Sequence, residues 1–142
     1  MPQITKDEKV LYPELSYKIM GLCFQVQNNL GRFRNEKSYA DALEEALKES
    51  GINYKREFRL PISFKGELQG RNIPDFIIED KIVVDIKAKR LIIKDDYFQV
   101  KRYLAVSGKE LGIIVNFRPK YITSKRVLIR VQNSEHSDTF VD

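Results

Sequence analysis

Three segments of the chain are predicted to be helices, and a glycine follows each of them. The predicted helices run from Glu14 to Leu30, from Glu36 to Ser50 and from about Asp95 to Ser107. In the first two, apolar residues recur three and four positions apart, which places them on one face of a helix. The glycines that close the three helices are Gly31, Gly51 and Gly108. Glycine readily adopts the left-handed conformation in which many helices end.

The second predicted helix begins with an acid that shares its apolar face. Asn35 is a suitable N-cap, and Glu36 lies three and four residues before Tyr39 and Ala40 of the apolar stripe. The Glu36 carboxylate is therefore aimed toward the core side at the helix start. Acids also favour helix N-termini because of the helix dipole, so a functional and a purely structural explanation both stay open for Glu36.

The apolar runs outside the helices are short, as in strands. The predicted strands lie within residues 53–64, 76–78, 82–84, 111–117 and 126–131. The second and third flank "EDK" and form a hairpin, and "KGELQG" is the turn after the first. The order helix, helix, three strands, helix, strand, strand predicts one mixed α/β domain over residues 1–131, followed by a polar tail at residues 132–142.

The hairpin carries charges where a sheet favours Val and Ile. Asp75 opens the first strand, and Asp85 and Lys87 lie near the end of the second. A three-residue loop places Asp75 opposite Asp85, on one face and with Cβ atoms roughly 4.5–5.5 Å apart. Lys87 shares that face because it lies two residues further on. A two-residue loop would turn Asp85 to the other face.

Two opposed carboxylates destabilise a sheet unless something neutralises them. One explanation is a raised pKa on one of the acids. A second is a bound divalent cation, which takes oxygen ligands from carboxylates and backbone carbonyls. The third is that the strand ends are solvated and the lysine pairs locally. The spacing alone leaves all three open.

Composition narrows the chemistry that is available. The 142 residues are 42% hydrophobic and 32% charged, enough for one packed core, and the net charge of +5 suits a nucleic-acid partner. One Cys (Cys23) and one His (His136, in the polar tail) argue against disulfides, zinc clusters and Ser-His or Cys-His catalysis. With neither a membrane-length apolar run nor a signal peptide, a cytoplasmic protein is expected.

The charged hairpin resembles a known nuclease signature. Pro74-Asp75, nine intervening residues and then Asp85-Ile86-Lys87 are similar to the motif of the PD-(D/E)XK nuclease superfamily. "NEKSYADALEEAL" resembles the helix of the GxxExxY proteins, a branch of that superfamily, with Glu36 and Tyr39 as its E and Y. The likeness implies a restriction-endonuclease-like core, in which helices flank a mixed β-sheet.

Further motifs extend this resemblance over roughly residues 14–129, with some departures. Gln99 and Tyr103 in "DYFQVKRYL" match the QxxxY helix of several nuclease branches. The glycine of GxxExxY would fall at Phe33, Gln27 stands where the family often has His, and the third motif acid is Asp where this branch has Glu.

The resemblance implies hydrolysis of phosphodiester bonds in nucleic acid with Mg²⁺ or Mn²⁺ as cofactor, and DNA is expected over RNA as the substrate, although the sequence alone leaves both open. Asp75, Asp85 and the Ile86 carbonyl would hold the cation, and Glu36 would complete its shell directly or through a water. Lys87 would orient the attacking water or stabilise the charge that develops on the phosphate.

Other residues are expected to complete the site. Gln99 would hydrogen-bond the attacking water or an acid. The predicted substrate contacts are Tyr39, Tyr103, Arg34, Lys101 and Arg102. Two rival functions stay open: a non-catalytic nucleic-acid-binding module on the same fold, and a protein-interaction domain, with a homodimer among its forms, in which the two aspartates are merely solvated.

Overall fold

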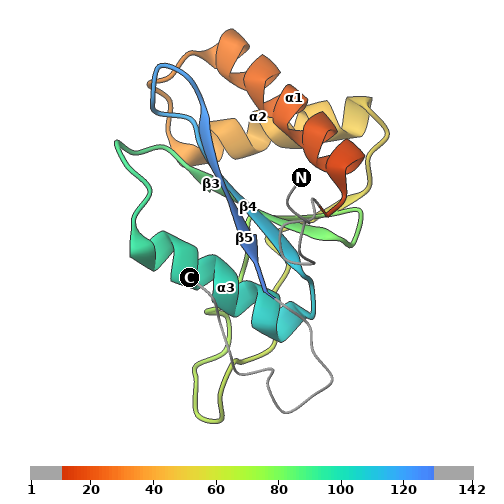
Figure 1. Cartoon of the computed structure of the whole chain (residues 1–142), viewed down its shortest axis with the longest axis vertical. Helices are drawn as coiled ribbons and strands as arrows, with labels where there is room; N and C mark the ends of the chain where they lie inside the picture. The colour runs from red at the N-terminus through yellow and green to blue at the C-terminus, as the bar shows by residue number, and fades with distance from the viewer. Residues whose placement is uncertain (1–10, 130–142) are drawn as a thin grey trace, which may run out of the picture.

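A five-stranded mixed sheet runs through the middle of the molecule, with helices on both of its faces (Figure 1). The computed structural model describes residues 11–129. Its elements are α1 (Pro13–Leu30), α2 (Glu36–Glu49), β1 (Tyr54–Arg56), β2 (Phe76–Ile78), β3 (Ile82–Lys87), α3 (Lys94–Ser107), β4 (Leu111–Asn116) and β5 (Thr123–Leu128). The predicted order of elements, the three helices and the α/β class are confirmed.

The helix ends follow the local signals in the sequence. The Asn35 side chain accepts a hydrogen bond from the backbone N–H of Ser38 at 2.8 Å and so caps α2. Gly31 and Gly108 follow α1 and α3 with φ values of 80° and 76°, in the region that favours glycine. These caps fix where α2 begins, and with it the position of Glu36.

The strands are ordered β1-β2-β3-β4-β5, and only β3 and β4 run parallel to each other. In the β2–β3 hairpin Ile78 pairs with Ile82, so the loop has the three residues on which the sequence prediction depended. Its first two, Glu79 and Asp80, have φ values of 54° and 56°. The parallel β3–β4 connection needs a crossover, and α3 supplies it.

Each face of the sheet has its own hydrophobic core. On one face, β-strand residues such as Val84, Ile86 and Ile113 pack against α1 and α2. On the other face, Ile77, Val83, Ile114 and Val127 pack against Val100, Tyr103 and Leu104 of α3. Buried Cys23 belongs to the first core, and burial raises the pKa of its thiol to about 12. It is a small buried apolar side chain.

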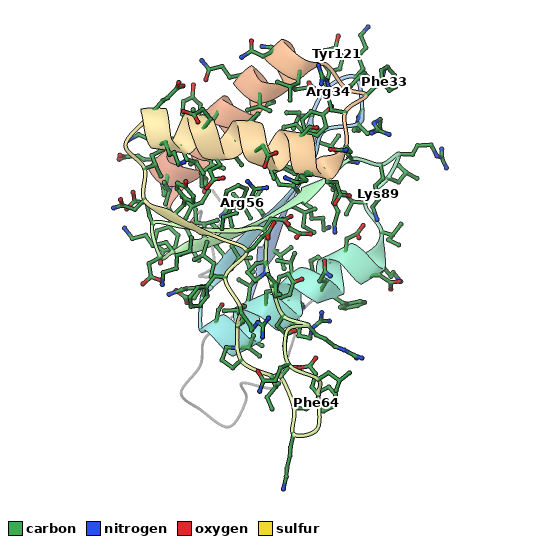
Figure 2. All side chains as sticks on the ribbon, turned by 180° about the vertical axis from the view of Figure 1, so that it is seen from behind. Phe33, Arg34, Arg56, Phe64, Lys89 and Tyr121 are labelled. Atoms are coloured by element: carbon green, nitrogen blue, oxygen red, sulfur yellow. The ribbon has the colours of Figure 1, made fainter. Side chains whose placement is uncertain are left out.

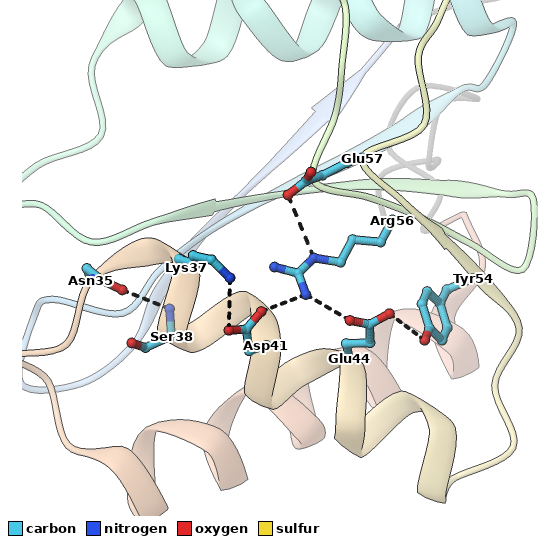
Figure 3. Close-up of polar contacts among 8 residues, drawn as sticks. All are labelled: Asn35, Lys37, Ser38, Asp41, Glu44, Tyr54, Arg56 and Glu57. Atoms are coloured by element: carbon cyan, nitrogen blue, oxygen red, sulfur yellow. Dashed lines mark hydrogen bonds and ion pairs between the residues drawn. The ribbon is translucent and has the colours of Figure 1, made fainter.

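Polar contacts join α2 to the edge strand β1 (Figure 3). The guanidinium of Arg56 lies 2.7 Å from Asp41 and 2.8 Å from Glu44, and the hydroxyl of Tyr54 donates to the same glutamate at 2.7 Å. Because these contacts come from successive turns of α2, they fix the rotation of the helix about its axis.

The predictions for the first and last strands were wrong in extent. The strand expected within residues 53–64 is only Tyr54–Arg56, because Glu57 adopts a left-handed conformation (φ 52°) and the chain then leaves the sheet. The last strand begins at Thr123, three residues before its predicted start, because it pairs back along β4 with Asn116 opposite Thr123. Residues 130–142, and with them His136 and the predicted domain boundary, lie outside the described residues.

None of the helices within residues 11–129 is long and apolar enough to cross a membrane.

Candidate active site

Two aspartates meet on the face of the sheet that α3 covers. Ile77 of β2 pairs with Val83 of β3, and both belong to the core on the α3 side. Side chains alternate along a strand. Asp75 lies two residues before Ile77 and Asp85 lies two residues after Val83, so both side chains face the α3 side and oppose each other. Asp75 Oδ2 accepts a hydrogen bond from the backbone N–H of Ile86 at 2.6 Å, which fixes it across the end of the hairpin.

Burial and mutual repulsion shape the electrostatics of this pair. Burial, and after it the charge of Asp85, raise the pKa of Asp75 to about 7, although the hydrogen bond from the Ile86 N–H acts in the opposite direction. Asp85 is only 4% exposed, and its buried Oδ2 accepts no hydrogen bond. The ammonium of Lys87 lies 3.0 Å from this oxygen and forms an ion pair with it.

Lys87 stands at the centre of the charged cluster. Its Nζ donates to Gln99 Oε1 at 3.4 Å and lies 3.8 Å from Asp96 Oδ1. Burial, the largest single influence, lowers the pKa of this lysine, but the interactions with the carboxylates of Asp85, Glu36 and Asp96 together outweigh burial and raise it. Lys87 is therefore a cation at neutral pH, able to stabilise negative charge and unable to accept a proton.

Glu36 contributes to this field from the start of α2. Its side chain is exposed, and its charge is one of the influences that raise the pKa of Lys87. Within residues 11–129, however, no group of three or more Asp, Glu, His or Cys side chains could hold a metal ion. The expected direct ligation by Glu36 is therefore not seen in this structure, and contact through a water is the form that its exposed position allows.

The donor atoms at the hairpin suit a hard divalent cation that keeps several waters. Asp75 and Asp85 supply carboxylate oxygens, one of them buried without a hydrogen bond. In a strand the carbonyl of a residue points to the same edge as its N–H, so the Ile86 carbonyl lies on the side of Asp75. If the hairpin register is continued, Pro74 stands opposite Ile86. Because proline has no N–H, it cannot donate a hydrogen bond to the Ile86 carbonyl. Two carboxylates, a carbonyl and waters match the preference of Mg²⁺ or Mn²⁺.

Helix α3 presents the predicted glutamine and tyrosine to the same cluster. Gln99 is half-buried and bonded to Lys87, whereas Tyr103 is only 4% exposed and packs in the α3 core. Burial, and after it the charge of Asp85, raise the pKa of Tyr103 to about 12. Its hydroxyl therefore stays protonated at the wall of the site.

Two of the residues predicted to contact the substrate, Tyr39 and Arg102, have structural roles instead. Tyr39 is fully buried, stacks on Phe117 with ring centroids 4.4 Å apart, and donates its hydroxyl proton to the Gly31 carbonyl. It has no surface with which to contact a substrate. Arg102 is half-buried and donates to the side chain of Asn72 at 2.8 Å, which ties α3 to the loop that leads into β2.

The other two predicted contacts differ in exposure. Arg34 is exposed beside the start of α2, where a phosphate could reach it. Lys101 is only 8% exposed, and its ammonium lies 5.1 Å from the centre of the Tyr97 ring. Of the five predicted contacts, Arg34 is thus the one that the structure leaves most accessible.

Sequence reasoning missed Asp96 and Asn116. Asp96 is 8% exposed, ion-pairs with both Lys87 and Lys89, and accepts from the backbone N–H of Ile93. Buried Asn116 accepts from the Lys89 N–H at 3.1 Å and donates to the Lys89 carbonyl at 2.7 Å. Acids are common in the first turn of a helix, so no signal in the sequence separated Asp96 from an ordinary helix start.

Comparison with known proteins agrees with this geometry. The sequence model of the PD-(D/E)XK nuclease superfamily matches residues 13–130. No curated protein matches the chain.

One solved structure is similar in fold, and a second aligns less well. The crystal structure of SSO0001 superposes with a TM-score of 0.51 at 23% identity, over 85% of this chain and 59% of that one. An alkaline exonuclease, LHK-Exo from Laribacter hongkongensis, gives a TM-score of 0.48 at 14% identity, over 84% of this chain and 71% of that one. The chain thus spans less than two thirds of the length of SSO0001, and at this identity the likeness concerns the fold alone.

Proposed function

Because the chain belongs to the PD-(D/E)XK nuclease superfamily, we propose that it is a nuclease that depends on Mg²⁺ or Mn²⁺ and hydrolyses phosphodiester bonds of nucleic acid, with DNA as the expected substrate. The observation that carries the proposal is the pair of opposed aspartates beside Lys87. Burial and repulsion raise the pKa of Asp75 to about 7, and buried Asp85 has Lys87 as its ion-pair partner, 3.0 Å from Oδ2. A fold keeps such unfavourable groups together where function requires them.

Each residue of the proposed active site has a role that follows from its position. Asp75, Asp85 and the Ile86 carbonyl are the proposed ligands, and a bound cation would supply a more acidic water and charge neutralisation at the phosphate. Lys87, a cation fixed by Asp85 and Asp96, stabilises the negative charge that develops on the phosphate oxygens. Gln99 orients Lys87 through its hydrogen bond, and Glu36 acts through water from the start of α2.

The proposal extends to the branch of the superfamily. Glu36 and Tyr39 stand on the first turn of α2, as E and Y do in the GxxExxY motif, and the Tyr39 hydroxyl fixes the backbone just before that turn. This supports membership of the GxxExxY branch. A cytoplasmic location and a homodimer stay predictions.

Cleavage assays on matched substrates test the proposal. Single- and double-stranded DNA and RNA are incubated with the wild type in EDTA, in Mg²⁺ and in Mn²⁺. We expect cleavage only with metal, and its loss in Asp85→Asn. The matched control is Asp80→Asn, which makes the same change on the exposed hairpin loop, where the side chain pairs with Lys109, and it should leave cleavage intact.

The alternatives predict other results. Binding of nucleic acid without cleavage in any metal would favour the non-catalytic binding module. Neither binding nor cleavage would favour the protein-interaction domain. Cleavage that persists in Asp85→Asn would place the active site elsewhere.

A further inference from the structure

Two aromatic rings project into solvent from neighbouring loops. Phe33, between α1 and α2, is 77% exposed, and Tyr121, between β4 and β5, is 75% exposed. Figure 2 shows both rings at one corner of the molecule, with Arg34 beside them. Large apolar rings normally gain free energy by leaving water, so two that stay exposed together call for an explanation.

The loop that carries Phe33 is held firmly in place. The guanidinium of Arg118 donates to the carbonyls of Arg32 and Arg34 at 2.7 and 2.8 Å, and the Arg32 side chain donates back to the Arg118 carbonyl at 2.8 Å. The hydroxyl of buried Tyr39 accepts from the Arg34 N–H at 3.2 Å. Both neighbours of Phe33 are therefore fixed, and the ring is displayed on a stable backbone.

Cations surround the two rings. The Arg32 and Arg118 guanidinium carbons lie 4.9 and 5.9 Å from the centre of the Phe33 ring. The Lys120 ammonium lies 5.6 Å from the centre of the Tyr121 ring. Within residues 11–129, none of these three side chains, nor that of Arg34, forms an ion pair with a carboxylate. Their charge is thus available to an anionic partner.

Both loops join the proposed active site through the backbone. Phe33 stands three residues before Glu36. The loop with Tyr121 starts where β3 and β4 end together, since Lys87 pairs with Asn116 and the Phe117 N–H donates to the Lys87 carbonyl at 2.9 Å. The rings therefore lie on loops that begin at the same end of the sheet as Lys87 and at the start of α2.

We propose that Phe33 and Tyr121, with Arg32, Arg34, Arg118 and Lys120 around them, form a site that stacks the unpaired bases of a single-stranded segment of the substrate. This inference rests on the proposed nuclease function and specifies the form of nucleic acid that the active site receives. Aromatic rings stack on any base, and the cations between them meet the phosphates. In a duplex the faces of the bases are already stacked, so the rings select a single strand.

Direct binding measurements without cleavage test this site. Fluorescence anisotropy in EDTA compares a labelled oligothymidylate of about 12 nucleotides, within the usual site size, with an abasic sugar–phosphate strand of equal length and charge. We expect the wild type to bind the strand with bases more tightly. The Phe33→Ala/Tyr121→Ala variant should lose about thirtyfold in affinity for that strand and keep its affinity for the abasic one.

Three controls test whether the loss of affinity reflects charge, the position of the ring or folding. The dependence of affinity on salt should be the same in the double variant and the wild type, because no cation is removed. Phe64→Ala removes a ring that is 59% exposed at the opposite end of the molecule (Figure 2), and its affinity should equal that of the wild type. Equal melting temperatures would show that the variants are folded.

The possible failures are distinguishable. Unchanged affinity of the double variant, an equal loss on the abasic strand, or no preference of the wild type for bases would overturn the stacking site, even if the wild type cleaves with Mn²⁺. A base-dependent affinity that the double variant loses, in a wild type that cleaves nothing with Mn²⁺, would leave the stacking site standing and refute the proposed nuclease function.

Discussion

The charge state of Lys87 decides which part it can take in hydrolysis. Three carboxylates surround it and raise the pKa of its ammonium, even though burial acts in the opposite direction. A lysine that is always protonated has three donors and no acceptor. It can neither ligate a metal ion nor act as a general base. What it can do is donate hydrogen bonds to a phosphate oxygen whose negative charge grows in the transition state.

Replacing Lys87 with Ala should therefore separate catalysis from metal binding. We expect the cleavage rate to fall about 10²–10³-fold, as it does when one stabilising donor is removed from an active site. Mn²⁺ affinity, measured by calorimetry, should be kept or increased because Asp85 loses its competing cation at 3.0 Å. The matched control is Lys81→Ala on the exposed hairpin loop, with both properties unchanged. A parallel loss of rate and Mn²⁺ affinity would mean that Lys87 organises the ligands.

At the scale of the elements, α3 packs unusually close to the sheet at Gly112 of β4. A Cβ built on Gly112 of β4 would lie 2.4 Å from Cγ1 of Val100 in α3. Such a contact is far inside van der Waals range, and valine has little rotamer freedom in a helix with which to yield. Gly112 thus lets α3 approach the sheet and brings Gln99, the neighbour of Val100, within reach of Lys87.

Gly112→Ala should consequently push α3 away from the sheet. We expect a loss of about 1–3 kcal/mol in the free energy of unfolding, measured with urea, as for other overpacked cores, together with slower cleavage. Adding Val100→Ala should recover part of both, because the new methyl then occupies the space that the valine leaves. Since Val100→Ala alone should destabilise the wild type, the second substitution changes sign between the two backgrounds. If the effects of Gly112→Ala and Val100→Ala on the free energy of unfolding were strictly additive, the inferred contact between the two positions would be contradicted.

The sequence predicted those elements whose signals are local. Asn35 and Gly31 mark helix ends, and the three-residue hairpin loop sets the register that opposes Asp75 to Asp85. The first strand was predicted too long because the left-handed conformation of Glu57 leaves no mark in an apolar pattern. Asp96 was missed because its contact with Lys87 depends on how α3 packs. Only the tertiary structure brings that pair together.

For the molecule as a whole, the site is a source of instability that depends on pH. Folded Asp75 keeps its proton up to about pH 7, whereas an aspartate in the unfolded chain releases it near pH 4. Between these values the folded state binds more protons than the unfolded state, so the contribution of Asp75 to the free energy of unfolding falls as pH rises. Above pH 7, folding has to hold an ionised Asp75 in this buried position beside Asp85.

Asp75→Asn should remove this dependence while keeping the fold. The amide oxygen can still accept the Ile86 N–H, and Asp85 keeps its ion pair with Lys87. In EDTA we expect the variant and the wild type to melt at similar temperatures near pH 4. The variant should gain an advantage as pH rises, and above pH 7 it should melt several degrees higher. Thermal unfolding followed by circular dichroism between pH 4 and pH 8 measures this difference directly.

Mn²⁺ at pH 7.5 should then reverse the order of the two proteins. A ligand that binds only the folded state stabilises it by about 2.7 kcal/mol at a hundredfold excess over Kd. The wild type should gain this stabilisation, and the variant, which lacks one carboxylate of the pair, should gain far less. Asp80→Asn on the exposed loop is the matched control and should follow the wild type in both solutions. An equal gain in the variant and the wild type would show that Asp75 is not a ligand, and a constant difference in melting temperature between pH 4 and pH 8 would show that its pKa is not raised.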